Sequence, residues 1–375
     1  MKNNICFVAG HSGGHIIPTI ILAKKNLENK IFFFTTNNQA DKNILNNYKE
    51  ILTQKINLPI KNIPKNKLNY PQFILSFIYN FFKSFFYLIR IKPIKIISTG
   101  GLVSVPVCLA AKFLLIPIDL YELNVEPGKT VNFLAKFCNP TIYICFASTQ
   151  NYLPKNKCII APYPIRFDPK IKNITQQEAL TKINLSPSRK TILILGGSQG
   201  SLFINNLIKD FVNKLNKTDL LLNKSMLPGS VRPERTLSEP WRVEERVEGY
   251  KRINSNFTVN NINIIHQTGD IDFDWQNFYK QKSIPAITFN FNNEMENYYL
   301  ASDLIICRSG AGTLAEILFF GKKCITIPLE TKTTSHQLLN AQALEKDHPD
   351  LFKVIRQKDI EKNPDIIFYE IKTII

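Results

Sequence analysis

"ICFVAGHSGGHIIPT", residues 5–19, joins a short apolar run to a glycine-rich turn and then to a second apolar stretch. Five apolar residues that end at a glycine are typical of a buried strand. Glycines after a strand let backbone N–H groups approach a ligand, and the start of the next helix adds a positive dipole end. The turn alone is compatible with a phosphate cradle, a metal site, a catalytic histidine or a simple tight turn.

The same pattern of a short apolar run followed by a helical stretch recurs along the chain. Continuous apolar strands separated by helices indicate parallel sheets covered on both faces. Two such series predict an α/β fold of two doubly wound domains. The expected strands are residues 5–9, 31–35, 95–98, 117–121, 141–146 and 157–161, then 191–195, 262–265, 284–289, 304–307, 324–328 and 352–355.

The break between the two series lies in a proline-rich stretch, residues 161–180, which is typical of a linker. We expect a first domain over 1–162, a linker over 163–189 and a second domain over 190–350. A C-terminal tail over 351–375 is expected to pack back on the first domain. Residues 226–252 hold five of the ten arginines and no Asn or Ile, so we expect an inserted surface loop there.

The chain of 375 residues carries a net charge of +17, which favours an anionic partner. The candidates are a phosphorylated substrate, an anionic membrane surface and nucleic acid, but no base-stacking or groove-reading motif supports the last. The seven cysteines form no C-x-x-C and mostly lie in apolar runs. We expect reduced, buried thiols, no metal site and no signal peptide.

An aromatic stretch over residues 72–92 resembles a membrane span in its hydrophobicity, but polar side chains interrupt it. Ser76, Asn80, Lys83, Ser84 and Tyr87 recur at helical spacing, so the sequence predicts an amphipathic helix rather than a span. Part of its apolar face should pack on the first sheet, and part can dip into a membrane interface. The residues expected at the membrane are Phe77, Phe81, Phe82, Lys83 and Phe85.

Three further glycine-rich turns follow expected strands: "TGGLVS" (99–104), "GGSQGS" (196–201) and "RSGAGT" (308–313). None matches the dinucleotide or P-loop pattern, which disfavours a dehydrogenase or an ATPase. Glu316 follows the last turn within a predicted helix. Its carboxylate is placed either to accept hydrogen bonds from ribose hydroxyls or simply to face solvent.

Together these motifs resemble the MurG family, the N-acetylglucosaminyltransferases that act on undecaprenyl-pyrophosphoryl-muramoyl-pentapeptide. The shared motifs run in register from about residue 4 to about residue 346, interrupted by 226–252. They are "GHSGGHIIP" (10–18), "GGLVSVP" (100–106), "YELNVEPG" (121–128), "YPIR" (163–166), "GGSQG" (196–200), "HQTG" (266–269) and "CRSGAGTLAE" (307–316).

The resemblance implies the GT-B architecture, two Rossmann-like domains facing each other across a cleft. It also implies inverting transfer of GlcNAc from UDP-GlcNAc to lipid I, giving lipid II for peptidoglycan synthesis, without a cofactor or a bound metal. The enzyme would be peripheral, on the anionic cytoplasmic face of the inner membrane. Further implied partners are proteins of cell-wall synthesis, cell shape and cell division.

The resemblance also implies the site residues. His15 would be the base that takes a proton from the acceptor hydroxyl, a role that suits a side chain titrating near neutrality, with Glu122 as the second candidate. Gly100, Gly101 and Ser104 would bind the acceptor pyrophosphate. The implied UDP-GlcNAc contacts are Ser12, Gly13, Gly14, Asn124, Arg166, Ser198, Asn292, Ala311, Gly312, Thr313, Leu314, Ala315, Glu316 and Gln337.

The sequence departs from the family pattern at His11, Val105, Tyr121 and Leu123, and Ser12 keeps the hydroxyl of a usual threonine. Val105, Tyr121 and Leu123 lie where the acceptor would approach. Two alternatives therefore stay open: a related GT-B transferase with another lipid acceptor such as diacylglycerol, and a catalytically weak protein that binds a UDP-sugar as a membrane scaffold.

Overall fold

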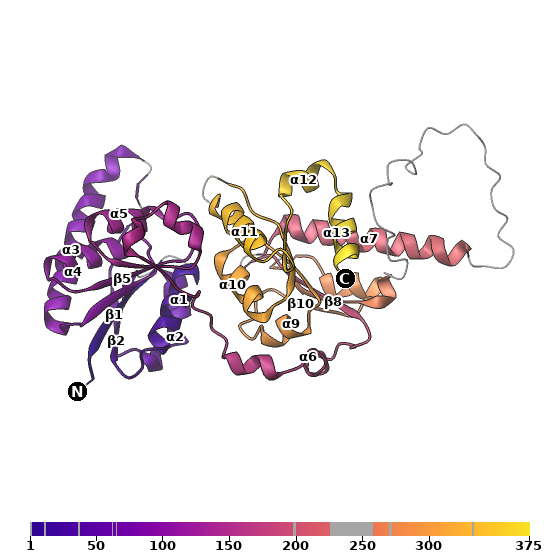
Figure 1. Cartoon of the computed structure of the whole chain (residues 1–375), viewed down its shortest axis with the longest axis horizontal. Helices are drawn as coiled ribbons and strands as arrows, with labels where there is room; N and C mark the ends of the chain where they lie inside the picture. Colours follow the sequence, from indigo (N-terminus) through magenta and orange to yellow (C-terminus); the bar gives the residue numbers. More distant parts are fainter. Residues whose placement is uncertain are drawn as a thin grey trace. The chain divides into compact units, whose positions relative to one another are not determined.

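In the computed structural model the chain divides into two compact units, Met1–Phe167 and Asp168–Ile375 (Figure 1). The residues described are 2–10, 13–36, 38–61, 63–64, 66–197, 200–225, 258–269, 272–331 and 334–375. The expected inserted loop over 226–252 lies outside them.

Unit 1 is built on one parallel sheet with the strand order β3-β2-β1-β4-β5-β6-β7. All of the expected strands of this half are present, and β3 is an addition, because its four residues carry a single buried apolar side chain, Ile56. The strands are β1 (Asn4–Val8), β2 (Lys30–Thr35), β3 (Gln54–Asn57), β4 (Lys95–Ser98), β5 (Ile118–Glu122), β6 (Thr141–Ile144) and β7 (Cys158–Ile160).

Helices cover both faces of this sheet, as the continuous apolar strands require. The helices are α1 (Gly13–Lys24), α2 (Gln39–Asn46), α3 (Tyr70–Ile91), α4 (Ser104–Phe113) and α5 (Lys129–Phe137). Alternate strand residues serve the two faces: Phe7 packs in a core with α1 and α2, while Cys6 and Val8 pack in a core with α3, α4 and α5.

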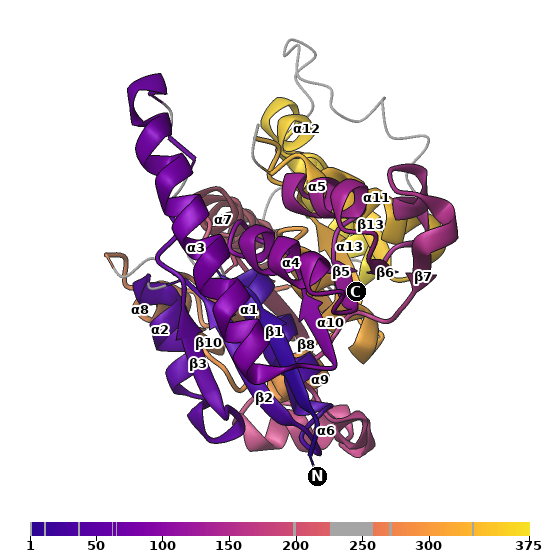
Figure 2. The same cartoon turned by 90° about the vertical axis from the view of Figure 1, so that its left-hand side faces the viewer.

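Helix α3 lies against α4 on the outside of unit 1 (Figure 2), and two residues of its polar stripe are turned inward. Its polar residues Asn80 and Ser84 are fully buried. The Asn80 side-chain amide donates to the Ser76 carbonyl at 2.7 Å, and the Ser84 hydroxyl donates to the Asn80 carbonyl at 2.7 Å. The Asn80 amide nitrogen and the Ser84 hydroxyl thus find acceptors within their own helix. The Asn80 side-chain oxygen is buried without a hydrogen-bond partner among the described residues.

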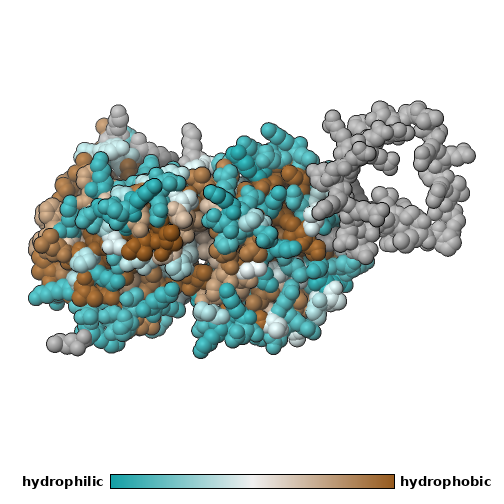
Figure 3. All heavy atoms as spheres, in the orientation of Figure 1, coloured by the Kyte–Doolittle hydropathy of each residue, from teal (hydrophilic) through white to brown (hydrophobic). Residues whose placement is uncertain are grey.

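Part of the wide apolar face of α3 is turned to solvent, and hydrophobic residues gather on the surface where α3 and α4 lie (Figure 3). Of the residues expected at a membrane, Phe82 is 53% exposed, whereas Phe77, Phe81 and Phe85 pack partly buried against the core. Lys83 donates to the Asn57 carbonyl at 3.0 Å, at the end of β3. The exposed apolar residues of α3 are Tyr70, Ile74, Leu75, Ile78, Tyr79, Phe82, Phe86 and Ile89.

By length and composition, α3 is also the one helix in the described part of the chain that could cross a membrane. However, its last turns are built into unit 1, because Leu88 and Ile91 belong to the same core as β1 and β4. A spanning α3 would remove both side chains from that core.

Unit 2 is built on a second parallel sheet, with the strand order β10-β9-β8-β11-β12-β13. All of the expected strands of this half are present. They are β8 (Lys190–Leu195), β9 (Ile262–Gln267), β10 (Ala286–Phe289), β11 (Leu304–Cys307), β12 (Lys323–Thr326) and β13 (Phe352–Val354). The helices are α6 (Gln176–Lys182), α7 (Leu202–Ser225), α8 (Trp275–Gln281), α9 (Glu296–Ala301), α10 (Ala311–Phe320), α11 (His336–Asp347), α12 (Gln357–Lys362) and α13 (Asp365–Ile374).

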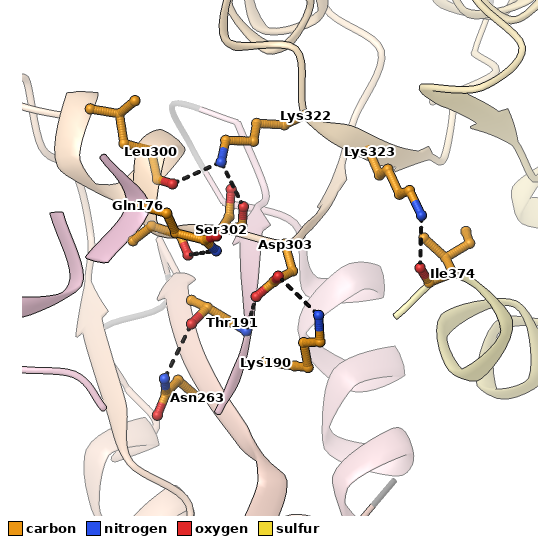
Figure 4. Close-up of polar contacts among 11 residues, drawn as sticks. Gln176, Lys190, Thr191, Asn263, Leu300, Ser302, Asp303, Lys322, Lys323 and Ile374 are labelled. Carbon is orange, nitrogen blue, oxygen red and sulfur yellow. Dashed lines mark hydrogen bonds and ion pairs between the residues drawn. The ribbon is translucent and has the colours of Figure 1, made fainter. Parts of the chain in front are cut away.

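A set of polar contacts holds the amino ends of these strands (Figure 4). The Asp303 carboxylate accepts from the Thr191 backbone N–H at 2.8 Å and pairs with Lys190 at 3.4 Å. The Lys322 ammonium donates to the Leu300 carbonyl at 2.8 Å. These contacts stabilise the amino ends of the strands. The glycine turns lie at the opposite end of the sheet, after the carboxyl ends of the strands.

The segment expected as a linker, 163–189, contains a regular helix. Helix α6 has a complete capping box, in which Thr175 and Glu178 exchange hydrogen bonds. Its Ala179 and Leu180 are buried, and Gln176 donates to the Ala301 carbonyl at 3.0 Å. Residues 176–182 are therefore part of unit 2.

Residues 351–375, which the sequence analysis treats as a tail outside the second domain, are likewise built into unit 2. Strand β13 extends the second sheet beside β12. On α13, Ile367 and Ile371 belong to the second core, and the Phe368 and Phe211 rings lie 5.7 Å apart. The strand over 352–355 was expected, but the domain limit at 350 left it outside the second domain, whereas β13 and α13 extend unit 2 to residue 375.

Candidate active site

Both sheets have a topological switch point, where successive strands begin to be added on the other side of the first strand. The switch falls between β1 and β4 in unit 1 and between β8 and β11 in unit 2. In open α/β sheets, ligands bind outside the carboxyl ends of the strands at such points. All four glycine-rich turns singled out in the sequence follow these four strands.

In unit 1 the turns after β1 and β4 touch. Gly101 has a φ of +83°, and a side chain there would place its Cβ 3.1 Å from the Gly10 carbonyl oxygen. Glycine at this position therefore allows both the backbone conformation and the close approach of the two turns. Gly13 and Gly14 begin α1 directly beside them, while His11 and Ser12 lie outside the described residues.

His15, in the first turn of α1, lies over the second glycine turn. Its ring Nδ1 is 2.8 Å from the Thr99 carbonyl oxygen. A carbonyl can only accept, so Nδ1 carries the proton, and in the neutral ring Nε2 keeps the lone pair. The Thr19 and Thr99 hydroxyls both donate to the His15 carbonyl, at 2.8 and 2.9 Å. Both backbone and ring are thus anchored, and the tautomer required of a base at Nε2 is imposed.

Glu122, at the end of β5, is engaged by its own loop. One carboxylate oxygen accepts from the Asn124 backbone N–H at 2.9 Å, and the other accepts from the Gly128 N–H at 3.0 Å. The side chain is 3% exposed. Burial raises the pKa of Glu122 to about 7, against the opposing effect of these N–H donors. Its geometry suits shaping the 123–128 loop, including Asn124, better than reaching a substrate.

Ser104 is placed inside the turn rather than on its surface. Its hydroxyl is fully buried, donates to the Gly100 carbonyl at 2.6 Å and lies 2.7 Å from the Ser98 hydroxyl. The Gly100 N–H in turn donates to Ser98 at 3.1 Å. This placement favours a role for Ser104 in shaping the turn, with the Gly100 and Gly101 backbone as the ligand-facing part.

Tyr121, one of the departures from the family pattern, stacks on Tyr143, with ring centroids 4.6 Å apart. Burial and the neighbouring Tyr143 raise the pKa of Tyr121 to about 12. The phenol of Tyr121 therefore stays protonated near neutrality.

In unit 2, a buried arginine that the sequence analysis missed joins the turns after β8 and β11. Arg308 is 9% exposed and donates to the Ser201 hydroxyl from Nε at 3.2 Å and from a terminal nitrogen at 3.0 Å. It also donates to the Ile327 carbonyl at 3.2 Å and to Gln357 at 3.0 Å. A charged residue at the end of the fully apolar strand "LIIC" was the signal that could have found it, because a buried charge needs specific partners.

Helix α10 begins at this edge of the sheet with Ala311, Gly312 and Thr313, and no side chain caps it within the described residues. Its backbone N–H groups are thus available to an anion. Glu316, on the same helix, accepts a hydrogen bond from the Tyr299 hydroxyl at 2.8 Å. That contact fixes the carboxylate and answers the simplest alternative, a purely solvent-facing Glu316.

Two further residues expected to contact UDP-GlcNAc are held by hydrogen bonds to backbone groups. Gln337 accepts from the Leu329 N–H at 3.0 Å, after β12. Asn292 accepts from the Glu294 N–H at 2.9 Å, after β10. The expected residues Ala311–Glu316, Gln337 and Asn292 therefore all follow carboxyl ends of the second sheet, while Ser198 lies outside the described residues. Arg166 stands at the end of unit 1, with its guanidinium 4.9 Å from the Phe167 ring centre.

Among the described residues, no group of three or more His, Cys, Asp or Glu side chains is arranged to hold a metal ion. All seven cysteines are free thiols. The arrangement at both switch points consists instead of helix starts, glycine turns and one oriented histidine, a chemistry of anion binding and proton transfer.

Comparison with known proteins agrees with this geometry. The family model for the glycosyltransferase family 28 N-terminal domain matches residues 5–143, and that for the C-terminal domain matches residues 191–371. Two doubly wound units with glycine turns at their switch points define a glycosyltransferase of the GT-B fold. The chain belongs to glycosyltransferase family 28 and, within it, to the MurG family that its motifs predict.

The UDP-N-acetylglucosamine–N-acetylmuramyl-(pentapeptide) pyrophosphoryl-undecaprenol N-acetylglucosamine transferase of Pelagibacter ubique is 30% identical over 92% of this chain and 83% of its own length. The Bacillus subtilis protein of the same name is 28% identical over 91% and 83%. The crystal structure of Acinetobacter baumannii MurG has a TM-score of 0.67 at 20% identity and covers 99% of this chain and 90% of its own.

Proposed function

We propose that the chain transfers N-acetylglucosamine from UDP-N-acetylglucosamine to undecaprenyl-pyrophosphoryl-N-acetylmuramyl-pentapeptide, the lipid I of peptidoglycan synthesis, giving lipid II. The observation that carries the proposal is the match to N-acetylglucosamine transferases along both units, 30% identity over 92% of the chain. The glycine turns and helix starts at both switch points supply the anion-binding elements that a UDP-sugar and a lipid pyrophosphate need.

In the proposed reaction, His15 Nε2 takes the proton of the acceptor hydroxyl as its oxygen attacks the anomeric carbon. The bond from that carbon to the diphosphate oxygen breaks, so the configuration inverts and UDP leaves with the bonding electrons. The Thr99 carbonyl, 2.8 Å from Nδ1, holds the required tautomer. Arg166 and the start of α10 would stabilise the charge that develops on the diphosphate.

We further propose that unit 1 binds the anionic cytoplasmic face of the inner membrane through the exposed stripe of α3. Phe82 and Phe86 are 53% and 67% exposed. Phe113, the last residue of the neighbouring α4, and Leu115, just after it, are 72% and 90% exposed. Exposing an apolar surface of this kind to water is unfavourable, and burying it at a membrane interface is favourable. Contacts with proteins of cell-wall synthesis and division remain predictions.

The experiment that tests the transfer is an assay with radiolabelled UDP-GlcNAc and UDP-galactose, each offered with a lipid I analogue and with diacylglycerol. We expect GlcNAc on the lipid I analogue alone. His15→Ala should lower the rate roughly 10²–10⁴-fold, the usual contribution of a general base. Transfer to diacylglycerol would support the other acceptor class, and UDP binding without any transfer would support a scaffold. A nearly full rate for His15→Ala would rule out His15 as the base.

A further inference from the structure

A chain of buried hydrogen bonds in unit 2 lies behind the glycine turn after β8 and is outside the set of residues expected to touch substrate. His266, at the end of β9, is fully buried. Its Nδ1 is 2.8 Å from the Tyr279 hydroxyl of α8, and its Nε2 is 3.1 Å from the Asn205 Oδ1 of α7. The Asn205 Nδ2 donates to the Thr268 carbonyl at 2.9 Å. Three elements and one loop thus meet through a single imidazole.

The partners determine the direction of every bond in this chain. The Thr268 carbonyl can only accept, so the Asn205 amide nitrogen faces it and the amide oxygen faces His266. His266 Nε2 must then carry the proton, which leaves Nδ1 to accept from the Tyr279 hydroxyl. Burial lowers the pKa of His266 to about 3, so the ring is neutral as this arrangement requires. The Trp275 ring packs edge-on at 4.8 Å and confines the imidazole further.

The end of the chain, the Thr268 carbonyl, abuts the turn at the start of α7. A Cβ on Gly200 would lie 2.5 Å from that carbonyl oxygen and 2.8 Å from the Gly269 Cα. Gly200 has a φ of +75°, and its neighbour Ser201 accepts from Arg308. The position of the 268–269 backbone therefore limits where Gly200 and the first residues of α7 can lie.

We propose that His266, together with Tyr279 and Asn205, is a positioning residue that sets the start of α7 for binding the donor diphosphate. The inference rests on the proposed function, because it takes a UDP-sugar as the ligand of this turn. None of the three side chains touches the ligand; they act through the Thr268 carbonyl on Gly200. Disturbing them weakens binding of the sugar donor equally in the ground state and in the transition state. The effect therefore falls on donor affinity and KM rather than on kcat.

Two variants test this with minimal change of shape. Asn205→Asp keeps the oxygen that accepts from His266 but turns an acceptor toward the Thr268 carbonyl, and Tyr279→Phe removes only the hydroxyl. The control is Asn263→Asp, at the other end of β9, where an equally buried Asn donates to the Ser186 carbonyl at 2.8 Å. Calorimetric UDP binding, KM and kcat for UDP-GlcNAc, and amide hydrogen exchange of residues 200–205 are measured for each.

We expect UDP binding roughly tenfold weaker in Asn205→Asp and about threefold weaker in Tyr279→Phe, the scale of one lost hydrogen bond. KM for the donor should rise in parallel, kcat should stay within about threefold, and exchange at 200–205 should accelerate. Asn263→Asp should lower the melting temperature without changing UDP affinity. Unchanged affinity in both test variants, or equal weakening in the control, overturns the inference.

The outcomes also separate this inference from the proposed function. Native protein that binds UDP but transfers nothing to lipid I would refute the proposed transfer, while weaker UDP binding in the variants would still support the positioning role. A native chain that does not bind UDP at all would overturn both.

Discussion

Glu122 lies at the end of β5 and His15 lies in the first turn of α1. Their hydrogen-bond partners distinguish their roles. The Glu122 carboxylate accepts from the backbone N–H groups of residues 124 and 128. His15 donates from Nδ1 and keeps a lone pair on Nε2. The motifs placed both residues at the correct edge of the sheet, but they could not separate the two roles. The difference lies in the backbone groups that each side chain meets, N–H groups of its own loop for Glu122 and the Thr99 carbonyl for His15.

We predict that Glu122→Gln removes a pH dependence of stability. The native carboxyl has a pKa of about 7, above its usual 4.5. Between these values the unfolded chain releases a proton that the folded chain retains, so native stability should fall as pH rises from about 4.5 to about 7, by up to roughly 3 kcal/mol. Urea unfolding at half-unit pH steps gives the free energy of unfolding of native protein and variant. Across this window it should fall with rising pH in the native protein and change less in the variant.

The control for this prediction is Glu126→Gln, an exposed carboxylate of the same loop. The substitution removes one carboxylate, as Glu122→Gln does, but from an exposed position. The stability of Glu126→Gln should therefore depend on pH as that of the native protein does. If Glu122→Gln showed the native pH slope as well, the buried carboxyl would not be its source.

Other residues of the candidate site show a similar limit. Ser104 was expected to face a pyrophosphate, and the structure buries its hydroxyl against the Gly100 carbonyl. Arg308 was passed over, although it joins two of the four turns. Motif spacing locates a turn on the sheet, whereas the direction of each side chain depends on which turns the strand order brings together.

Among the elements, α3 shows a feature that helical periodicity did not predict, because two residues of its polar stripe, Asn80 and Ser84, are buried. A stripe of Ser, Asn and Lys residues is normally taken as the solvent face of an amphipathic helix. Here Asn80 and Ser84 are small enough for close packing against α4, and the Asn80 amide nitrogen and the Ser84 hydroxyl donate to carbonyls of the same helix. The helix was predicted correctly, but its orientation depends on packing that periodicity alone does not contain.

We predict that Phe82→Ser combined with Phe86→Ser weakens membrane binding without destabilising the fold. Each exposed phenylalanine contributes apolar area only when it enters an interface, at about 25 cal/mol per Å². Cosedimentation with vesicles containing anionic lipid should show at least a roughly tenfold drop in partitioning, since a buried aromatic side chain is worth about 1.5–3 kcal/mol. The melting temperature should stay within about a degree or two, as for most surface changes.

Phe85→Ser is the matched variant, because Phe85 lies on the same helix but packs partly buried against the first core. It should lower the melting temperature and leave vesicle binding closer to native. Equal loss of vesicle binding in both variants, or none in the double variant, would contradict a membrane-facing stripe.

The strands themselves were almost all predicted, since both sheets are parallel and covered on two faces and their strands are continuous apolar runs. The exception, β3, is an edge strand with one buried apolar residue, Ile56. Its place in the sheet comes from pairing with β2. Local sequence carries the central strands, and tertiary pairing determines the edge.

At the scale of the whole molecule, two series of strands predicted two domains, and each unit has a core of its own. The limits of unit 2 were less predictable. Helix α6 carries few apolar residues, and the apolar residues of 351–375 do not show from sequence which core they join. Their membership is seen in contacts such as that of Gln176 with the Ala301 carbonyl and in the packing of Ile367 and Ile371 in the second core.

The separate cores predict two unfolding transitions in calorimetry, and UDP should raise one of them more than the other. Val107 is fully buried in unit 1 and Ile264 is fully buried in unit 2, so Val107→Ala should lower one transition and Ile264→Ala the other. The free energy of unfolding should fall by about 2–5 kcal/mol for Ile264→Ala and by less for Val107→Ala. The nucleotide contacts expected at Glu316 and Asn292 belong to unit 2, so UDP at about 100 times its Kd should stabilise the transition that Ile264→Ala shifts, by roughly 2.7 kcal/mol. A single transition lowered equally by both substitutions would mean that the units unfold together, and a UDP shift confined to the transition of Val107→Ala would place nucleotide binding in unit 1.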